Sequence, residues 1–367
     1  MLYIGTKKEE EDYRAAPGLS QSFLKKLEGS MSEIHKELDS SKDFIRIGKA
    51  VDALLTSKAD EFKDNFYVLS SDKSPSDTIV NIITIVYEKL EKAYVQYLLG
   101  LDLTSEKEPE SFVSWTGGLD EYHLLILGAA SSEGYGGKWK EDTVIKKIVE
   151  HNDYFRSMIE SQGKVVLSKS EFANCENIVL SLQTNPRTKK YFDQQFFDGN
   201  PNIDIYYQLP IFFTYKEVEC KALLDIVVVE KDDEGKIIKV TPIDLKTTMG
   251  DTYYFPKSFR LFKYYIQAFW YTEAAKAHFG VKPERFIFVV ESTTNFGKPL
   301  DFEVTDETMT MAYQGTKHLP GIEKLMENYS FYQEHGMEME RVIVESKGKP
   351  LQISLDGYEP NTENDDW

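Results

Sequence analysis

The spacing of apolar residues changes near residue 200 of this 367-residue chain. Before that point the spacing is mostly helical, since Ile47, Val51 and Leu54 would share one helix face. Ser168 and Glu171 stand in capping-box order before another apolar run. Helical periodicity covers residues 19–27, 44–62, 78–99, 140–163 and 168–185. The first half of the chain is therefore predicted to be mainly helical.

After residue 199 the pattern becomes typical of strands. Two runs rich in β-branched and aromatic residues, 204–230 and 237–248, are separated by the turn-forming sequence KDDEGK, which predicts successive strands in one sheet. The elements expected next are an amphipathic helix over 258–280 ending at Gly280, a strand over 285–293, a short strand near 302 and a final helix over 306–335. This order predicts an α/β core decorated by helices.

Length and composition indicate a folded protein with one large core. Hydrophobic residues make up 41% of the chain, which excludes a disordered solvating chain. We expect a single domain over residues 19–345, with a helical elaboration at about 70–198 and a catalytic core at about 200–300. Residues 1–18 are expected to form an N-terminal arm, and residues 346–367 an acidic tail with too little apolar content to fold alone.

Residue content disfavours several functional classes. The start of the chain lacks the apolar stretch of a signal peptide, and no run of about 18 apolar residues occurs, so we expect a cytoplasmic protein with no membrane partner. Cys175 and Cys220 are the only cysteines, too few for a disulfide framework or an iron-sulfur cluster supplied by this chain alone. The histidines and cysteines show no paired zinc-ligand spacing, so zinc is not expected either.

The formal net charge of -18 lowers the expectation of DNA binding, because Lys and Arg supply most of the affinity for phosphates. It does not exclude DNA. A site for divalent cations needs carboxylates, and a local basic path can exist on an acidic protein.

Asp225, Asp244 and Lys246 form the candidate chemical centre. Side chains two apart on a strand point to the same side, and hairpin pairing through KDDEGK could bring Asp225 beside the other two. Two carboxylates suit Mg²⁺, with Mn²⁺ as a substitute, because these ions take oxygen ligands. Such an ion could polarise a scissile phosphate while Lys246 orients water, which implies phosphodiester hydrolysis. Judged by spacing alone, an Asp-x-Lys triplet is more commonly a surface ion pair.

Segments around these residues resemble one nuclease family. They are CKALLD (220–225), IDLKTT (243–248) and FPKSFRLFKYYIQAFWYTEAAKAHFG (255–280), preceded by RIGKAVDALL (46–55) and by segments between 137 and 172. Over roughly residues 19–295 the chain resembles the RecE-like (exodeoxyribonuclease VIII-type) phage exonucleases of the PD-(D/E)XK nuclease superfamily. The resemblance implies an α/β fold with a PD-(D/E)XK core, a central mixed sheet flanked by helices, after a helical N-terminal half.

The resemblance also implies roles for residues of the predicted sheet. Asp225 and Asp244 would ligate the metal together with the Leu245 carbonyl, and Lys246 would be the catalytic lysine.

Three residues on helices complete the implied site. Gln267 and Tyr271 match the family's Q-x-x-x-Y motif, and their spacing of four places both on one helix face, directed toward the site. Asp52 stands where many relatives have a histidine of the metal site. A carboxylate there can still ligate Mg²⁺ and favours a harder ion, although a helix residue that faces solvent is the alternative.

Lys257, Arg260 and Lys263 recur every three residues near the start of the predicted helix over 258–280. This stripe could hold DNA phosphates, and a solvated helix face explains it equally well.

The function that the resemblance implies is a Mg²⁺-dependent exonuclease on double-stranded DNA, acting in phage or prophage recombination. Members of the family form ring-like homo-oligomers, and a single-strand annealing protein is their typical partner. An endonuclease of the same superfamily is one alternative. A catalytically silent module that binds DNA or protein is another, and the presence of Asp225, Asp244 and Lys246 argues against it.

Overall fold

The computed structural model describes residues 2–28, 43–56, 59–69, 75–99, 119–134, 139–151, 154, 157, 161, 164–192, 200–336, 341–350, 352–354 and 357–359. The chain divides into two compact units. The sheet unit comprises residues 1–39, 51–58 and 177–367, and the helical unit comprises residues 40–50 and 59–176. The expectation of a single domain over residues 19–345 stays a prediction.

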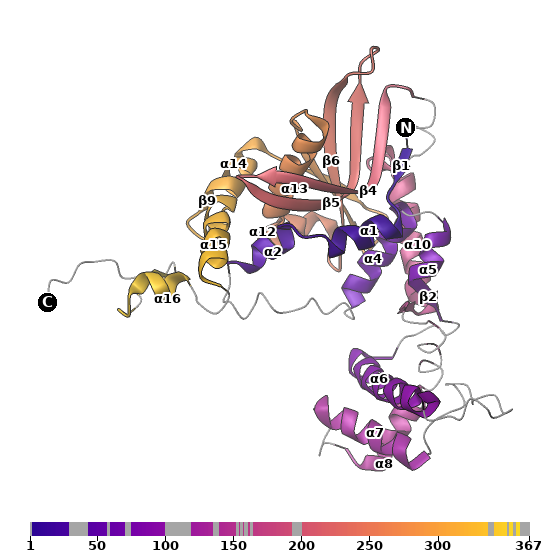
Figure 1. The fold of residues 1–367 in the computed structure, drawn as a ribbon. Coiled ribbons are helices and arrows are strands. Elements are labelled where there is room, and N and C mark those ends of the chain that lie inside the picture. Colours follow the sequence, from indigo (N-terminus) through magenta and orange to yellow (C-terminus); the bar gives the residue numbers. More distant parts are fainter. Residues whose placement is uncertain are drawn as a thin grey trace. The chain divides into compact units, whose positions relative to one another are not determined.

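The sheet unit is built on one six-stranded mixed sheet (Figure 1). In order across the sheet, the strands are β1 (Leu2–Ile4), β4 (Ile203–Tyr215), β5 (Val218–Lys231), β6 (Ile237–Thr248), β7 (Phe286–Ser292) and β8 (Leu300–Val304). The pairs β1–β4 and β6–β7 are parallel and the other pairs are antiparallel. The predicted strand runs therefore pair in sequence order, and the parallel step from β6 to β7 is made through a helix, as such crossovers require.

Helices complete the sheet unit. They are α1 (Lys7–Ala15), α2 (Gln21–Lys26), α12 (Phe255–Leu261), α13 (Tyr264–Phe279), α14 (Asp306–Gln314), α15 (Ile322–His335) and α16 (Arg341–Ser346), with the short 3₁₀ helices η1 (Lys189–Tyr191) and η2 (Thr252–Tyr254). Two small hairpins are formed by β9 (Gly315–Thr316) with β10 (Leu319–Pro320) and by β11 (Gln352–Ser354) with β12 (Gly357–Glu359). Helices α4 (Asp43–Thr56) and α10 (Lys169–Thr184) contribute residues to both units.

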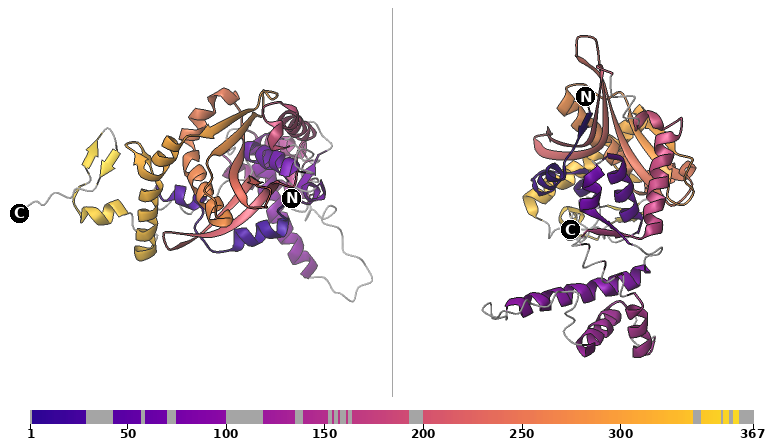
Figure 2. Two further views of the ribbon diagram at one scale, coloured as in Figure 1. Left: turned by 90° about the horizontal axis from the view of Figure 1, so that it is seen from above. Right: turned by 90° about the vertical axis from the view of Figure 1, so that its right-hand side faces the viewer.

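The core of the sheet unit lies between the sheet and α13, which contacts β4, β5 and β6. Ile266, Trp270 and Ala274 of this helix are fully buried, together with Phe286 and Phe288 of β7. Figure 2 shows that the long strands of this sheet are strongly curved. The predicted α/β architecture, a central mixed sheet flanked by helices after a helix-rich N-terminal half, is confirmed.

The predicted helix over 258–280 is interrupted. It forms α12 and α13, because Lys263 adopts a left-handed conformation with φ 53° and ends the first helical run. The second part is also not amphipathic, since it is buried on nearly every side. Gly280 ends α13 with φ 72°, as predicted from its sequence position. The predicted helix over 306–335 is likewise divided, into α14 and α15, by the β9–β10 hairpin.

The predicted N-terminal arm is structured. Its strand β1 extends the sheet edge beside β4, and α1 begins with a capping box between Thr6 and Glu9. The Lys221 ammonium of β5 donates to the carbonyls of Tyr13 and Ala16 at 2.9 and 2.6 Å. A cation at the carboxyl end of a helix offsets its dipole, so α1 is fixed at both ends.

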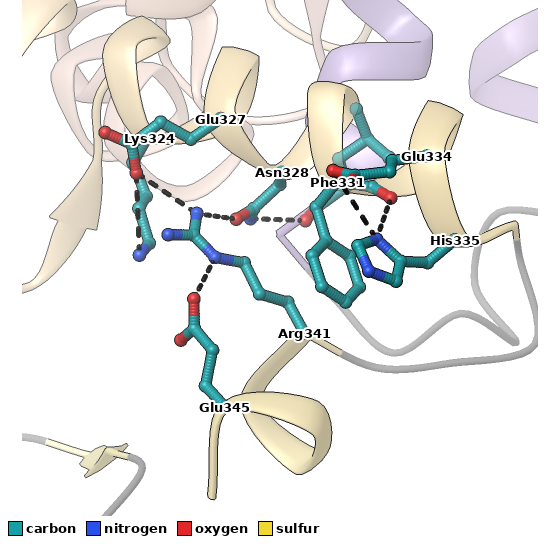
Figure 3. A network of polar contacts seen from close by, with 9 residues as sticks. Lys324, Glu327, Asn328, Phe331, Glu334, His335, Arg341 and Glu345 are labelled. Carbon is teal, nitrogen blue, oxygen red and sulfur yellow. Dashed lines mark hydrogen bonds and ion pairs between the residues drawn. The ribbon is translucent and has the colours of Figure 1, made fainter. Parts of the chain in front are cut away.

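The C-terminal part of the sheet unit is joined by a polar network (Figure 3). Arg341 of α16 donates to Glu345 (2.5 Å), and also to Glu327 and Asn328 of α15, both at 3.1 Å. Asn328 in turn donates to the backbone carbonyl of Leu27, at the end of α2 (2.9 Å). Within the predicted tail, residues 352–354 and 357–359 form the β11–β12 hairpin, and residues 360–367 lie outside the described residues.

The helical unit contains α5 (Ala59–Asn65), β2 (Phe66–Val68), α6 (Asp77–Leu99), α7 (Leu119–Ser132), α8 (Glu141–Val149) and β3 (Val165–Leu167). Strands β2 and β3 pair in parallel, and Ile83, Val86 and Ile126 are buried in a separate core. The predicted capping box is confirmed, because Ser168 and Glu171 exchange hydrogen bonds of 2.6 and 3.1 Å. None of the described helices has the length and apolar character needed to cross a membrane.

Candidate active site

The β5–β6 hairpin brings the predicted site residues together. Ile226 pairs with Ile243, so the next positions along the ladder are Asp225 and Asp244. Beyond this pair the strands separate, and the Leu245 N–H donates to Asp225 Oδ2 at 3.0 Å instead of to a backbone carbonyl. The hairpin thus holds the Asp225 side chain against the backbone of the predicted Asp244-Leu245-Lys246 segment. The role of the Leu245 carbonyl stays a prediction.

Asp244 is fully buried and contacts two predicted site residues. Gln267 Nε2 donates to its Oδ1 at 2.5 Å, and Lys246 Nζ lies 2.5 Å from its Oδ2. The second contact is an ion pair by distance, but its alignment leaves Oδ2 without a hydrogen-bond partner among the described residues. A buried carboxylate oxygen in that state has unused capacity for a ligand.

Lys246 lies between carboxylates and aromatic rings. Burial opposes its charged form, but the charges of Asp244 and Asp225 outweigh burial and raise the pKa of the ammonium above its ordinary value. Its Nζ lies 5.0 Å from the ring centroid of Tyr264 and 6.0 Å from that of Phe288. Lys246 is therefore held charged, and a charged lysine can offset the charge of an anionic substrate but cannot act as a base.

Asp52 reaches the site from α4. Gln208 Nε2 donates to Asp52 Oδ2 at 2.8 Å, and Thr56 Oγ1 donates to the Asp52 backbone carbonyl at 2.7 Å. Gln208 lies in β4 directly across from Asp225 and has a φ of 49°, a left-handed conformation that is rare inside a strand. Asp52 is half-buried, and its carboxylate accepts a hydrogen bond from Gln208 of the sheet. It therefore does not simply face solvent.

The three aspartates affect one another electrostatically. Burial, followed by the charge of Asp244, raises the pKa of Asp52 to about 7. Burial and the charges of Asp244 and Asp52 also hold the pKa of Asp225 well above its usual range. Lys246 lowers both values, but one ammonium does not balance three carboxylates. The surplus negative charge can be relieved by protons or by a bound cation.

Tyr271 lies on α13 one turn after Gln267 and is buried. Burial, with the charges of Asp225 and Asp244, holds the pKa of its phenol well above the ordinary value. Tyr271 is therefore a neutral group beside the carboxylates. The spacing of four puts both residues on the face of α13 toward the site, as predicted.

The predicted DNA-binding stripe is not continuous. Lys257 and Arg260 are exposed on α12, but the left-handed turn at Lys263 removes this residue from their helix. Lys263 forms an ion pair with Glu28. Two cations of the stripe thus remain available, and the third is neutralised.

Sequence reasoning missed Gln208 and Lys25. Gln208 could have been noticed as an amide inside a mainly apolar strand run, and the β4–β5 register, with Tyr207 paired to Ile226 and Leu209 to Leu224, places it opposite Asp225. Lys25 of α2 has its Nζ 5.3 Å from the Tyr264 centroid, on the ring that Lys246 also contacts. Burial and the nearby Lys246 lower the pKa of Lys25 to about 7. No sequence pattern connects Lys25 with β6.

The three aspartates are the candidate ligands for the implied Mg²⁺. Within the described residues, no three side chains of the His, Cys, Asp and Glu types form a ready metal cage. The carboxylates nevertheless fit a hard divalent cation, since they are oxygen donors with surplus charge and Asp244 Oδ2 lacks a hydrogen bond. Lys246 occupies one side of Asp244, so an ion would share that carboxylate with it.

Comparisons with known proteins add little. No protein-family model matches this chain, and no curated protein matches it. Among solved structures, a crystal structure named "Putative exonuclease" from Eubacterium rectale is similar at 13% identity and a TM-score of 0.32. The match covers 77% of this chain and 85% of that chain. A likeness this low assigns no function to this chain.

Proposed function

We propose that this protein is a metal-dependent nuclease that hydrolyses phosphodiester bonds in DNA, and that it acts as an exonuclease on double-stranded DNA. The main support is the convergence of Asp225, Asp244 and Lys246 at one end of a hairpin, with Gln267 bonded to the buried carboxylate. A surface ion pair, the commoner explanation of an Asp-x-Lys triplet, does not account for an Asp244 that is fully buried.

Each side chain has a role in this proposal. Asp225, Asp244 and Asp52 would hold Mg²⁺, or Mn²⁺ in its place, which would polarise the scissile phosphate and acidify a bound water. Gln267 fixes the orientation of Asp244 through its 2.5 Å hydrogen bond. Lys246, whose charged form Asp244 and Asp225 favour, would offset the negative charge that the phosphate gains.

The test incubates linear duplex DNA with Mg²⁺ and compares the wild type with Lys246→Ala. We expect a loss of at least about 100-fold in rate, because preorganised charge in an active site has effects of this size. Lys236→Ala, at the exposed turn of the same hairpin, is the matched control and should digest DNA normally. Equal digestion by all three proteins would contradict the catalytic role of Lys246. No digestion by any of them would favour the alternative of a catalytically silent binding module.

Closed circular DNA separates the two kinds of nuclease. An exonuclease needs an end and would leave the circle intact, whereas an endonuclease would nick it. A homo-oligomeric ring and an annealing-protein partner are further proposals from the family resemblance, and sedimentation of the purified chain tests the first.

A further inference from the structure

An aromatic corner adjoins Lys246. It consists of Lys25 at the end of α2, and of Phe262 and Tyr264 on either side of the break between α12 and α13; we name these three residues the Tyr264 corner. The ring of Tyr264 has Lys246 Nζ at 5.0 Å, Lys25 Nζ at 5.3 Å and the ring of Phe262 at 5.8 Å from its centroid. One partly buried ring thus lies close to the candidate catalytic lysine, to a second lysine and to a second aromatic side chain.

Phe262 is exposed although apolar partners are close by. Its side chain is 54% exposed, whereas Phe255, which stacks on Tyr264 at 5.8 Å, is only 3% exposed. The left-handed residue Lys263 follows directly and ends α12 at this point. An aromatic ring left in water beside a candidate active site offers a flat apolar surface for a ligand.

Lys25 has no ion-pair partner among the described residues. In the part of the chain that the structure describes, no carboxylate lies within ion-pair distance of its Nζ, whereas the neighbouring Lys263 is paired with Glu28. The ammonium groups of Lys246 and Lys263 oppose its charge, and Asp244 acts in the opposite direction. Two lysines that share one ring favour an anionic ligand beside that ring.

The position of Lys25 is fixed by its helix. Leu24 is fully buried, and Ser20 caps the first turn of α2 by accepting a hydrogen bond from Phe23 N–H. At the other end of α2, Asn328 donates to the Leu27 carbonyl (2.9 Å), as part of the network in Figure 3. Lys25 therefore lies on an anchored helix, which lowers the entropic cost of binding through it.

We propose that the Tyr264 corner binds a single-stranded segment of the substrate next to the scissile phosphate, with Lys25 contacting a backbone phosphate and an unpaired base stacking on Phe262. A flat ring combined with a cation is the combination by which proteins hold single strands without regard to sequence. The inference rests on the proposed function and deepens it, because it implies that the end of a duplex is frayed before cleavage.

The test measures binding, without divalent cations, of a fluorescent single-stranded oligonucleotide by anisotropy. Phe262→Ala should weaken binding by about 5- to 150-fold, which corresponds to the loss of one stacking contact of about 1–3 kcal/mol. Leu261→Ala is the matched control, since Leu261 is the preceding residue, is 66% exposed and has no ring to stack. It should bind within about twofold of the wild type, and Phe262→Trp should retain affinity.

The salt dependence of binding tests Lys25 separately. At pH 6, below the pKa of about 7 of Lys25, the side chain carries its charge. At that pH, Lys25→Gln should reduce the slope of the logarithm of the binding constant against the logarithm of the salt concentration by about 0.7, the value for one phosphate contact on a single strand, whereas Lys236→Gln should leave the slope unchanged. Three results would contradict the proposal for the Tyr264 corner. They are equal oligonucleotide affinity of Phe262→Ala and Leu261→Ala, equal salt dependence of binding by Lys25→Gln and Lys236→Gln, and no binding of the oligonucleotide by the wild type.

Failure of the corner and failure of the proposed function give different results. If DNA digestion depends on Lys246 but Phe262→Ala binds the oligonucleotide normally, only the strand-binding role of the Tyr264 corner is contradicted. If binding depends on Phe262 but the protein digests no DNA, the strand-binding role is supported and the proposed nuclease activity is contradicted.

Discussion

Replacing Lys246 by methionine tests the electrostatics of the candidate site most directly. Methionine has a similar length but no charge, so Lys246→Met leaves the fully buried carboxylate of Asp244 without its ion-pair partner. The hydrogen bond from Gln267 remains, but it does not neutralise a charge. Asp225 and Asp52 also lose the one cation that lowers their pKa values.

The expected destabilisation follows from this burial. Removing one partner of a buried ion pair costs about 3–5 kcal/mol, a large share of the roughly 5–15 kcal/mol by which domains are stable. With a urea m value of about 3 kcal/mol per M, the midpoint of unfolding should fall by about 1–1.7 M in EDTA at pH 8. Lys236→Met, on the exposed hairpin turn, should shift it by less than about 0.2 M.

Mg²⁺ should reduce the difference between Lys246→Met and the wild type. An ion bound to the carboxylates replaces the missing positive charge, and at 100 times its Kd it stabilises the protein by about 2.7 kcal/mol. The assay is urea unfolding followed by circular dichroism, with EDTA and then with Mg²⁺. If Lys246→Met and Lys236→Met unfold at the same urea concentration in EDTA, the buried pair described above is not present.

Three more variants test other parts of the site. The raised pKa of Asp52, about 7, means that its contribution to metal-free stability is complete below about pH 4 and is lost as pH rises through 7. In urea unfolding across this pH range, Asp52→Asn should therefore show a smaller fall in the free energy of unfolding than the wild type, by no more than about 4 kcal/mol. A smaller loss of unfolding free energy in the wild type than in Asp52→Asn over this pH range would contradict this prediction. Gln208→Gly removes the hydrogen bond to Asp52 but also relieves the left-handed backbone, so calorimetry should show weaker Mg²⁺ binding while stability changes by only about 1 kcal/mol. Unchanged Mg²⁺ affinity would remove Gln208 from the site. A Cβ at Gly5 would lie 2.3 Å from the Gln208 carbonyl oxygen, so Gly5→Ala should cost about 1–3 kcal/mol in unfolding experiments, whereas Gly128→Ala, with open space around its Cβ, should not destabilise the protein. Equal stability of the two alanine variants would show that the close approach at Gly5 is absent.

The sheet could be predicted because its strands are long and locally consistent. The runs forming β5 and β6 alternate or are continuously apolar, and a turn-forming sequence separates them, so the hairpin and its register follow from local rules. Register alone then places Asp225 beside Asp244. This part of the site needs no information from distant residues.

The break at Lys263 could not be predicted in the same way. Neither Phe262 nor Lys263 is a strong helix breaker, and the sequence has no Gly or Pro at this position. The left-handed turn accompanies tertiary contacts, namely the Lys263–Glu28 ion pair and the stack of Phe255 on Tyr264. Lys25 and Gln208 were missed for a related reason, because their contacts join segments far apart in the sequence.

The hydrogen bond between Gln208 and Asp52 also has a consequence for the order in which the protein folds. Asp225 and Leu245 are 20 positions apart, and Asp244 and Gln267 are 23 apart, whereas Gln208 and Asp52 are separated by 156. Contacts between near positions close small loops and form early, and those between distant positions form later. During folding, Asp225, Asp244 and Lys246 would thus come together first as one local group, and Asp52 would join them only when α4 packs against β4. Until that late step the cluster lacks one of its three carboxylates, so cation affinity would arise together with the finished fold.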